Sequence, residues 1–304
     1  MLYLSTRNKT DSFTAYRAMH NDNTPDGGLY VPFRLTPFSD AERKEIRQMS
    51  FGNAVAKLLN LFFNEQLTGW DVDFCIGRTP VKLESAGHKT VVAELWHNPD
   101  GSYETTRNIL YSRIFSTSQK PADWAKIAID TAILFGIHTQ MQEEMFDLSL
   151  PENAVPQIAA AWYAKELGLP IGRIILTCSD MSPAWDFVLH GKLNTAALKQ
   201  QSIGSDRLFE RIFFDLYGYE CVERYLSSKI FTLDEDAFRP IPEILSVVVV
   251  GNDRADNVTQ NVVRTNGYKL SSDAATAYGG LQDYRSRGGE SRPTLLLSLQ
   301  KPVN

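Results

Sequence analysis

The 304-residue sequence predicts an α/β protein with a mostly parallel sheet flanked by helices. Three mainly apolar runs, at residues 173–178, 244–250 and 294–299, have the length and composition of buried strands. Stretches with apolar residues at helical spacing separate these runs, as in successive αβ units. The content of 43% hydrophobic and 22% charged residues is that of a globular chain, and the length allows two domains.

The first third of the chain predicts a mixture of short strands and helices. Residues 1–10 are expected to contain a strand, and residues 12–19 a short helix with Ser12 as its cap. The run PDGGLYVP at residues 25–32 predicts a tight turn leading into a strand, because proline fixes φ and the glycines permit positive φ. The other predictions here are helices at residues 39–49 and 51–63 and two short strands around Gly87, whereas the class of residues 70–76 stays open.

The rest of the chain predicts helices that alternate with strands. Pro156 marks the beginning of one helix, and Gly168 and Gly267 mark the ends of two. Helices are predicted at residues 124–145, 156–167, 183–191, 205–217, 253–266 and 272–287. Together with the three apolar runs, they predict the parallel sheet and its covering helices.

Composition excludes several classes of partner. The net charge of -5 and the absence of a Lys/Arg-rich run give no electrostatic footprint for nucleic acid. The sequence shows no leader-peptide pattern and no apolar run of membrane-spanning length. We therefore expect a cytoplasmic location and no membrane partner. Cys75, Cys178 and Cys221 are odd in number and outside any CxxC spacing, which predicts free thiols in a reducing compartment.

Several motifs resemble one enzyme family. The start YLSTR at residues 3–7, followed by PDGGLYVP, resembles the amino-terminal domain of threonine synthases, which are fold type II pyridoxal-phosphate enzymes. Three further runs are similar to runs of that family in the same order, namely AAWYAKELGLPIGRIILT (160–177), LFERIFFDLYG (208–218) and GYKLSSDAATAYGG (267–280). The resemblance implies a threonine synthase-like N-terminal domain at residues 1–95 and a truncated α/β large domain at residues 96–304.

The position of the cofactor-binding lysine differs from the family. Threonine synthases carry a run like ELFHGPTLAFKD, whose lysine forms the Schiff base with pyridoxal phosphate. The run from Glu94 to His97 matches its beginning, but Glu104 stands at the position of the lysine. Because a carboxylate cannot form an imine, the resemblance implies that no aldehyde is attached there.

The phosphate-binding loop and the small domain differ as well. The family's TGNFG loop brings backbone N–H groups to the phosphate at a helix start. The residues at this place are Glu152, Asn153, Ala154, Val155 and Pro156. The carboxylate of Glu152 would repel a phosphate, and Pro156 has no N–H to donate. Only about fifteen residues follow Arg107 before the next similar stretch, so the family's small domain is expected to be absent, and no cofactor is expected.

A few titratable residues could support chemistry that needs no pyridoxal phosphate. His97 with Glu94 and Glu104 forms the tightest cluster, and Asp180 follows a predicted strand, so these four are the candidates for repurposed acid–base chemistry. An ordinary polar cluster explains the same residues. We expect solvated carboxylates at Asp22, Asp26, Asp71 and Asp73 and no metal site.

These differences predict a threonine synthase-like pseudoenzyme without pyridoxal-phosphate chemistry, acting as a binding or protein-interaction module. The alternatives are an enzyme with cofactor-independent chemistry in the residual cleft and a divergent threonine synthase-like lyase. A link to amino-acid metabolism rests on the resemblance alone. The expected partners are a second copy of the chain, another protein such as a genuine threonine synthase, or an amino-acid-like small ligand. Apolar surface left by the missing small domain would favour dimerisation.

Overall fold

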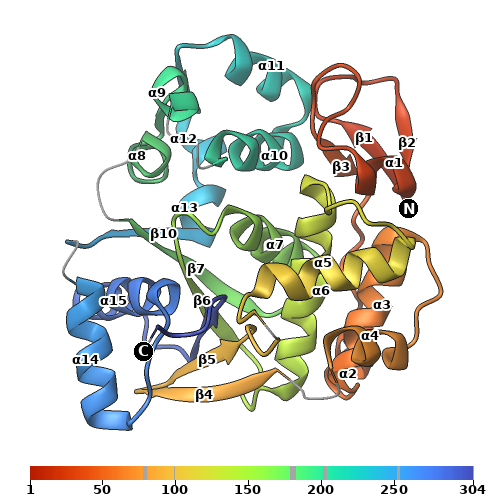
Figure 1. Cartoon of the computed structure of the whole chain (residues 1–304). Coiled ribbons are helices and arrows are strands. Elements are labelled where there is room, and N and C mark those ends of the chain that lie inside the picture. Colours follow the sequence, from red (N-terminus) through yellow and green to blue (C-terminus); the bar gives the residue numbers. More distant parts are fainter. Residues whose placement is uncertain (78–80, 99, 179–182, 201–203, 252–253, 304) are drawn as a thin grey trace.

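A six-stranded, mostly parallel sheet forms the centre of the molecule (Figure 1). The computed structural model describes residues 1–303 apart from residues 78–80, 99, 179–182, 201–203 and 252–253. The strand order is β10-β7-β6-β11-β5-β4, and only β4 runs antiparallel to its neighbour. The strands are β4 (Lys82–Gly87), β5 (Thr90–Glu94), β6 (Phe146–Pro151), β7 (Ile171–Cys178), β10 (Leu245–Val249) and β11 (Thr294–Ser298). The predicted α/β class is therefore confirmed.

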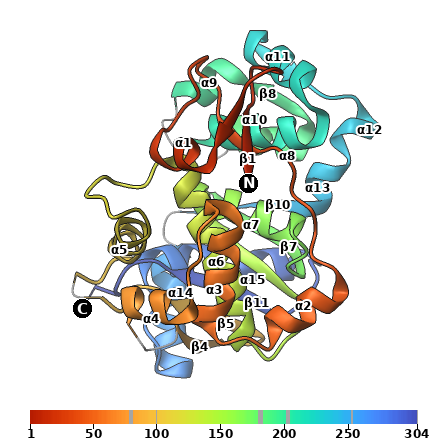
Figure 2. The same ribbon diagram turned by 90° about the vertical axis from the view of Figure 1, so that its right-hand side faces the viewer.

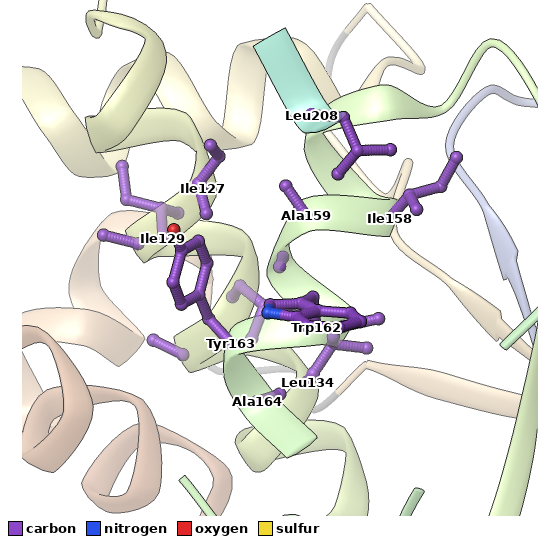
Figure 3. Close-up of a cluster of buried hydrophobic side chains, with 14 of the residues drawn as sticks. Ile127, Ile129, Leu134, Ile158, Ala159, Trp162, Tyr163, Ala164 and Leu208 are labelled. Atoms are coloured by element: carbon purple, nitrogen blue, oxygen red, sulfur yellow. The ribbon is translucent and has the colours of Figure 1, made fainter. Parts of the chain in front are cut away.

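Helices cover both faces of the sheet. On one face, α14 (Arg254–Asn266) and α15 (Ser272–Ser286) bury Val92, Ile175 and Leu296 of the strands. On the other face lies α7 (Val155–Glu166), which packs against α6 (Asp123–Gln140). Figure 3 shows Trp162 and Tyr163 of α7 among the isoleucine and leucine side chains of α6. These two helices form the densest part of the core because the facing side chains of both are apolar.

The first 32 residues form a compact unit that we call the N-terminal module. Its sheet has the order β2-β1-β3, with β1 (Leu2–Ser5), β2 (Ser12–Thr14) and β3 (Tyr30–Pro32), and α1 (Ala15–His20) follows β2. The prediction that Ser12 caps a helix is wrong. Residues 12–14 pair with β1 as a strand, and Thr14 caps α1 through a hydrogen bond from the Arg17 amide.

The turn of the PDGG run is closed by residues of both amino-terminal motifs. Ser5 donates to the two carboxylate oxygens of Asp26 at 2.9 and 2.8 Å, and Thr24 donates to the same carboxylate. Gly27 has a φ of 81°, a region that favours glycine. A Cβ on Gly28 would lie 2.3 Å from the Ser5 hydroxyl oxygen, so this position also requires glycine. Ser5 therefore links YLSTR to PDGGLYVP within the N-terminal module.

Three helices connect the module to the sheet. They are α2 (Asp40–Arg47), α3 (Phe51–Phe63) and α4 (Gly69–Ile76). Ser39 and Glu42 form a capping box at α2, and Ser50 caps α3, so both predicted helices are confirmed. Residues 70–76, whose class the sequence left open, are helical, and a second capping box, between Thr68 and Asp71, marks the start of this helix. The domain boundary expected at residue 95 falls just after β5. This strand pairs with β11, so residues on both sides of the expected boundary contribute strands to the six-stranded sheet.

The segment between β7 and β10 lies beside the N-terminal module (Figures 1 and 2). Its elements are α8 (Pro183–His190), β8 (Lys192–Asn194), α9 (Thr195–Gln200), α10 (Ser205–Tyr217), α11 (Tyr219–Ser227), β9 (Ile230–Thr232), α12 (Glu235–Phe238) and α13 (Pro240–Ile244). Glu210 of α10 accepts hydrogen bonds from Thr6 and from Arg7, the latter at 2.9 and 2.8 Å. Arg211 of α10 pairs with Asp123 of α6 at 2.8 Å. Adjacent residues of α10 thus bind the N-terminal module and the core.

Several elements depart from the prediction, among them the small elements between α8 and β10 other than α10, which were not predicted. The helix expected to reach residue 145 ends at Gln140, and the buried strand β6 follows it. The helix α5 (Tyr103–Phe115) was not predicted, because its polar and apolar residues are spread around the helix without a clear stripe. Among the described residues, no helix has both the length and the apolar character that a membrane span requires.

Candidate functional site

The carboxyl ends of the parallel strands meet at one edge of the sheet, where open α/β folds place their ligands. The segments that leave this edge are residues 95–102 after β5, residues 152–154 after β6 and residues 299–303 after β11. They contain four of the residues singled out from the sequence, His97, Glu152, Asn153 and Ala154, and Glu94 lies beside them at the end of β5. We call this region the carboxyl edge.

Glu94 and His97 are in contact at the carboxyl edge. Nε2 of His97 lies 2.7 Å from Oε2 of Glu94, and the hydroxyl of Tyr268 donates to Oε1 at 2.9 Å. The Glu94 side chain is only 4% exposed, and Lys82 Nζ approaches it at 3.8 Å. Burial, and after it the negative charge of Glu94, raises the pKa of Tyr268. Because a carboxylate only accepts, Nε2 carries the proton when His97 is neutral, and Nδ1 carries the lone pair.

The other two candidates do not join this pair in the described structure. Glu104 lies in the first turn of α5 with an exposed side chain, and its carboxylate is 3.7 Å from Lys120 Nζ. No contact links Glu104 to His97 or Glu94 among the residues described. Asp180 lies outside the described residues. The pair that the geometry supports is therefore Glu94 with His97.

A buried network that the sequence analysis missed fills the space between β5 and α7. Asp130 of α6 accepts hydrogen bonds from Tyr103 at 2.6 Å, from Arg107 at 3.0 Å and from Gln157 at 2.8 Å. Burial raises the pKa of Asp130, although the guanidinium of Arg107 opposes this shift. The cavity left among these side chains measures about 10 Å³, which is marginal even for one water. A single carboxylate within the apolar run of α6 was the signal that could have indicated such a network.

The run from Glu152 to Pro156 forms the beginning of α7. Ala154 precedes the helix without a side-chain cap, and Pro156 lies in the first turn. The Glu152 carboxylate accepts a hydrogen bond from the buried indole of Trp185. Burial, and after it Glu152, raises the pKa of Cys178 at the end of β7. The helix start thus has a carboxylate of the chain itself beside it.

The segments after β5 and β11 contact each other and the beginning of α15. Trp96 donates to the Ser298 hydroxyl at 3.0 Å, and Ser298 donates to Ser271 at 2.7 Å. The backbone N–H of Leu299 donates to Asp273 at 2.7 Å. Outside them lies a hollow of about 700 Å³ that His97 and Lys301 help to line. These residues form one packed surface rather than a set of independent changes.

The remaining acids and thiols have structural partners or ordinary environments. Asp26 and Asp71 close turns and caps, and Asp22 accepts from the Asp123 amide at 2.9 Å. Within the described residues, no group of three or more His, Cys, Asp or Glu side chains could hold a metal ion. All three cysteines are free thiols, in agreement with the prediction.

Comparisons with known proteins agree on the fold. Residues 2–79 match the family model of the threonine synthase N terminus. The structure is similar to PLP-bound threonine synthase from Brucella melitensis, with a TM-score of 0.80, 16% identity and coverage of 99% of this chain and 89% of that chain. Threonine synthase from yeast gives a TM-score of 0.81 at 15% identity, covering 99% and 87%, and that from Escherichia coli gives 0.73 at 14%, covering 99% and 89%. A search of curated proteins finds no match.

The fold is therefore that of the fold type II pyridoxal-phosphate enzymes. More narrowly, the chain is threonine synthase-like, with the family's N-terminal region in residues 2–79 and the threonine synthase fold over 99% of its length.

The residues at the carboxyl edge do not fit pyridoxal phosphate. The position expected to hold the Schiff-base lysine carries Glu104, which faces solvent beside Lys120. The beginning of α7 carries Glu152, which would repel a phosphate, and Pro156, which cannot donate to one. Between β5 and α6 the described chain contains only α5 as regular structure, so no strand of a second sheet occurs there among the described residues. No step of a mechanism can be assigned to this cofactor here.

Proposed function

We propose that the protein is a threonine synthase-like pseudoenzyme that lacks pyridoxal-phosphate chemistry and works as a binding or protein-interaction module, with a cytoplasmic location. The observation that carries the proposal is the filled region between β5 and α7. Tyr103, Arg107 and Gln157 converge on Asp130 there and leave a cavity of about 10 Å³. Because each donor satisfies the same buried carboxylate, a cofactor could enter this filled region only if the network came apart.

The test uses the absorbance of an imine. The purified protein is mixed with pyridoxal phosphate, and a genuine threonine synthase serves as the positive control. We expect no band at about 410 to 430 nm and no lysine labelled stoichiometrically after borohydride reduction. A band that borohydride removes, with the label on one lysine, would reject the proposal and favour a divergent lyase. The Lys82→Arg variant then tests the attachment site, because Lys82 lines a cavity of about 390 Å³ beside Glu94.

An exposed aromatic patch supports the interaction part of the proposal. Trp70 and Phe74 of α4 are 62% and 57% exposed and stack on each other at 5.3 Å, and Arg113 of α5 lies over Phe74. Tryptophan and arginine are enriched at the centres of protein interfaces. We take a second copy of this chain as the partner, and light scattering over a concentration range tests it. A dimer that dissociates in the Trp70→Ser variant but not in the equally exposed Tyr16→Ser control supports this choice. A wild-type monomer at all concentrations rejects it.

A second candidate is cofactor-independent chemistry with His97 as a general base. The contact between Glu94 and His97 favours it, since a carboxylate that holds Nε2–H orients the imidazole and leaves Nδ1 free to accept a proton. Proton exchange in D₂O, followed by NMR in mixtures of small metabolites, tests this candidate. Exchange that the wild type catalyses and His97→Phe does not would support catalysis. Exchange that the substitution leaves unchanged excludes His97 as the base, and no exchange above the protein-free rate supports binding alone.

A further inference from the structure

A cavity of about 390 Å³ lies beside the filled region and is separate from it. Its apolar wall contains Phe51 of α3, Ile76 of α4, Leu95 after β5 and Ile133 of α6. A cavity of this volume and composition suits a small organic molecule. Its walls come from both the amino-terminal helices and the core, so the packing of α3 and α4 against the sheet creates it.

One polar group of this cavity, the imidazole of His97, has an acceptor without a partner in the described chain. Lys82, Glu94, His97 and Thr106 line it together with the apolar residues. The ammonium of Lys82 is already bound to Glu84 at 2.7 Å, and the Thr106 hydroxyl accepts from Asn98 at 2.8 Å. His97 donates through Nε2 to Glu94, and no group of the described chain hydrogen-bonds to its Nδ1. With Nε2 protonated, the lone pair of Nδ1 is therefore an acceptor without a partner in the described chain.

The charges around the cavity also favour a cation as the ligand. Among the described residues, Glu84 and Glu94 contribute two carboxylates and Lys82 one ammonium, so the carboxylates outnumber the ammonium by one. Glu94 is 4% exposed, and its interaction with a bound charge is therefore weakly screened. The ring of Phe51 offers a further surface that attracts a cation.

We infer that this cavity binds a small primary amine with an apolar body, whose ammonium group donates to Nδ1 of His97 and lies near Glu94. The apolar body then occupies the space among Phe51, Leu95 and Ile133. A carboxylate of the same shape is disfavoured, because it would face Glu94 and a lone pair. This inference rests on the proposed function, since it names the class of ligand for a protein that works by binding.

The test compares three probes of matched shape by titration calorimetry: 3-methylbutylamine, 3-methylbutan-1-ol and 4-methylpentanoate. We expect the amine to bind at least about tenfold more tightly than the alcohol, and the carboxylate not to bind. Equal affinities for all three probes would show an apolar cavity without charge selection and would overturn the inference. A preference for the carboxylate, or no binding of any probe by folded protein, would overturn it too.

Two variants with opposite expected effects complete the test. Glu94→Gln should weaken amine binding at least about tenfold, because it removes the buried negative charge. Lys82→Met should strengthen it about fivefold, because it removes the competing ammonium from a side chain that is 55% exposed and tolerates substitution. Lys44→Met on exposed α2 is the control and should leave affinity unchanged. If amine binding fails while the imine band is also absent, this inference falls and the proposed function stands; an imine band on a lysine rejects the proposed function whatever the amine does.

Discussion

Buried charges stabilise two regions of the molecule, the contact of the N-terminal module with α10 and the carboxyl edge of the sheet. The sequence of the first region resembles that of threonine synthases, whereas the sequence of the second region departs from it. At the first region, residues of family-like motifs bind one another, since Thr6 and Arg7 of YLSTR contact Glu210 of LFERIFFDLYG. At the second region, Glu104 and Glu152 stand where the resemblance implies cofactor-binding residues, and they contact Lys120 and Trp185 instead.

The difference teaches which part of a family signature serves the fold. A motif that joins two parts of the chain remains necessary whether or not a reaction takes place. Residues that served a cofactor lose that constraint together, and packing then selects whatever fills the space. We therefore expect the charges of both regions to stabilise the fold, and only the carboxyl edge to have gained new contacts.

The largest loss of stability is expected in the buried network of Asp130, beside the carboxyl edge. Asp130→Ala should lower the free energy of unfolding by about 4 kcal/mol, because it leaves the buried guanidinium of Arg107 without its carboxylate. Urea denaturation followed by circular dichroism measures this. The control is Asp236→Ala, which removes an equally short Asp–Arg pair on the surface and should cause no measurable change. A similarly small loss for Asp130→Ala would mean that the network does not hold this region together.

A smaller loss is expected at the contact between the N-terminal module and α10. Arg7→Ala leaves Glu210 buried without a charge partner and should cost about 2 kcal/mol, less than a fully buried pair because Arg7 is 35% exposed. The same denaturation experiment measures it, with Lys9→Ala as the control because Lys9 and Glu220 are both exposed. The double variant Arg7→Met with Glu210→Leu should recover part of the loss, since no unpaired charge remains. Equal stability of Arg7→Ala and wild type would show that the shared motifs do not act through this pair.

The smallest effect is a dependence of stability on pH at the neighbouring contact, between α10 and Asp123 of α6. Burial alone would raise the pKa of Asp123, but Arg211 and Arg207 hold it below its ordinary value. A carboxyl group whose pKa is lower in the folded state adds stability above its unfolded pKa of about 3.9, and this stability is lost as the pH falls below that value. The urea midpoint should therefore fall more steeply from pH 5 to pH 3 in wild type than in Asp123→Asn. Parallel curves for the two proteins would contradict the assignment, and Asp236→Asn, which is exposed, should follow wild type.

The sequence was sufficient where a signal is local. The helices at residues 39–49 and 51–63 were predicted correctly, and the apolar runs marked β7, β10 and β11, because capping, helical spacing and burial are properties of neighbouring residues. It failed at α5, which has no clear apolar stripe, and at β6, which was included in the preceding helix. The candidate site was predicted in part: Glu94 and His97 are three residues apart and meet, whereas Glu104 turns to solvent with its helix.

By itself, the sequence determined the fold class, the order of most elements, the resemblance to threonine synthases and the absence of a lysine at the expected position. Only the tertiary structure decided that Asp130 collects three donors from α5 and α7, that Glu152 meets Trp185, and that a separate cavity remains beside Glu94. The physical reason is that these features depend on side chains far apart in the chain. Their distances are fixed by how helices pack on the sheet, which no local pattern encodes.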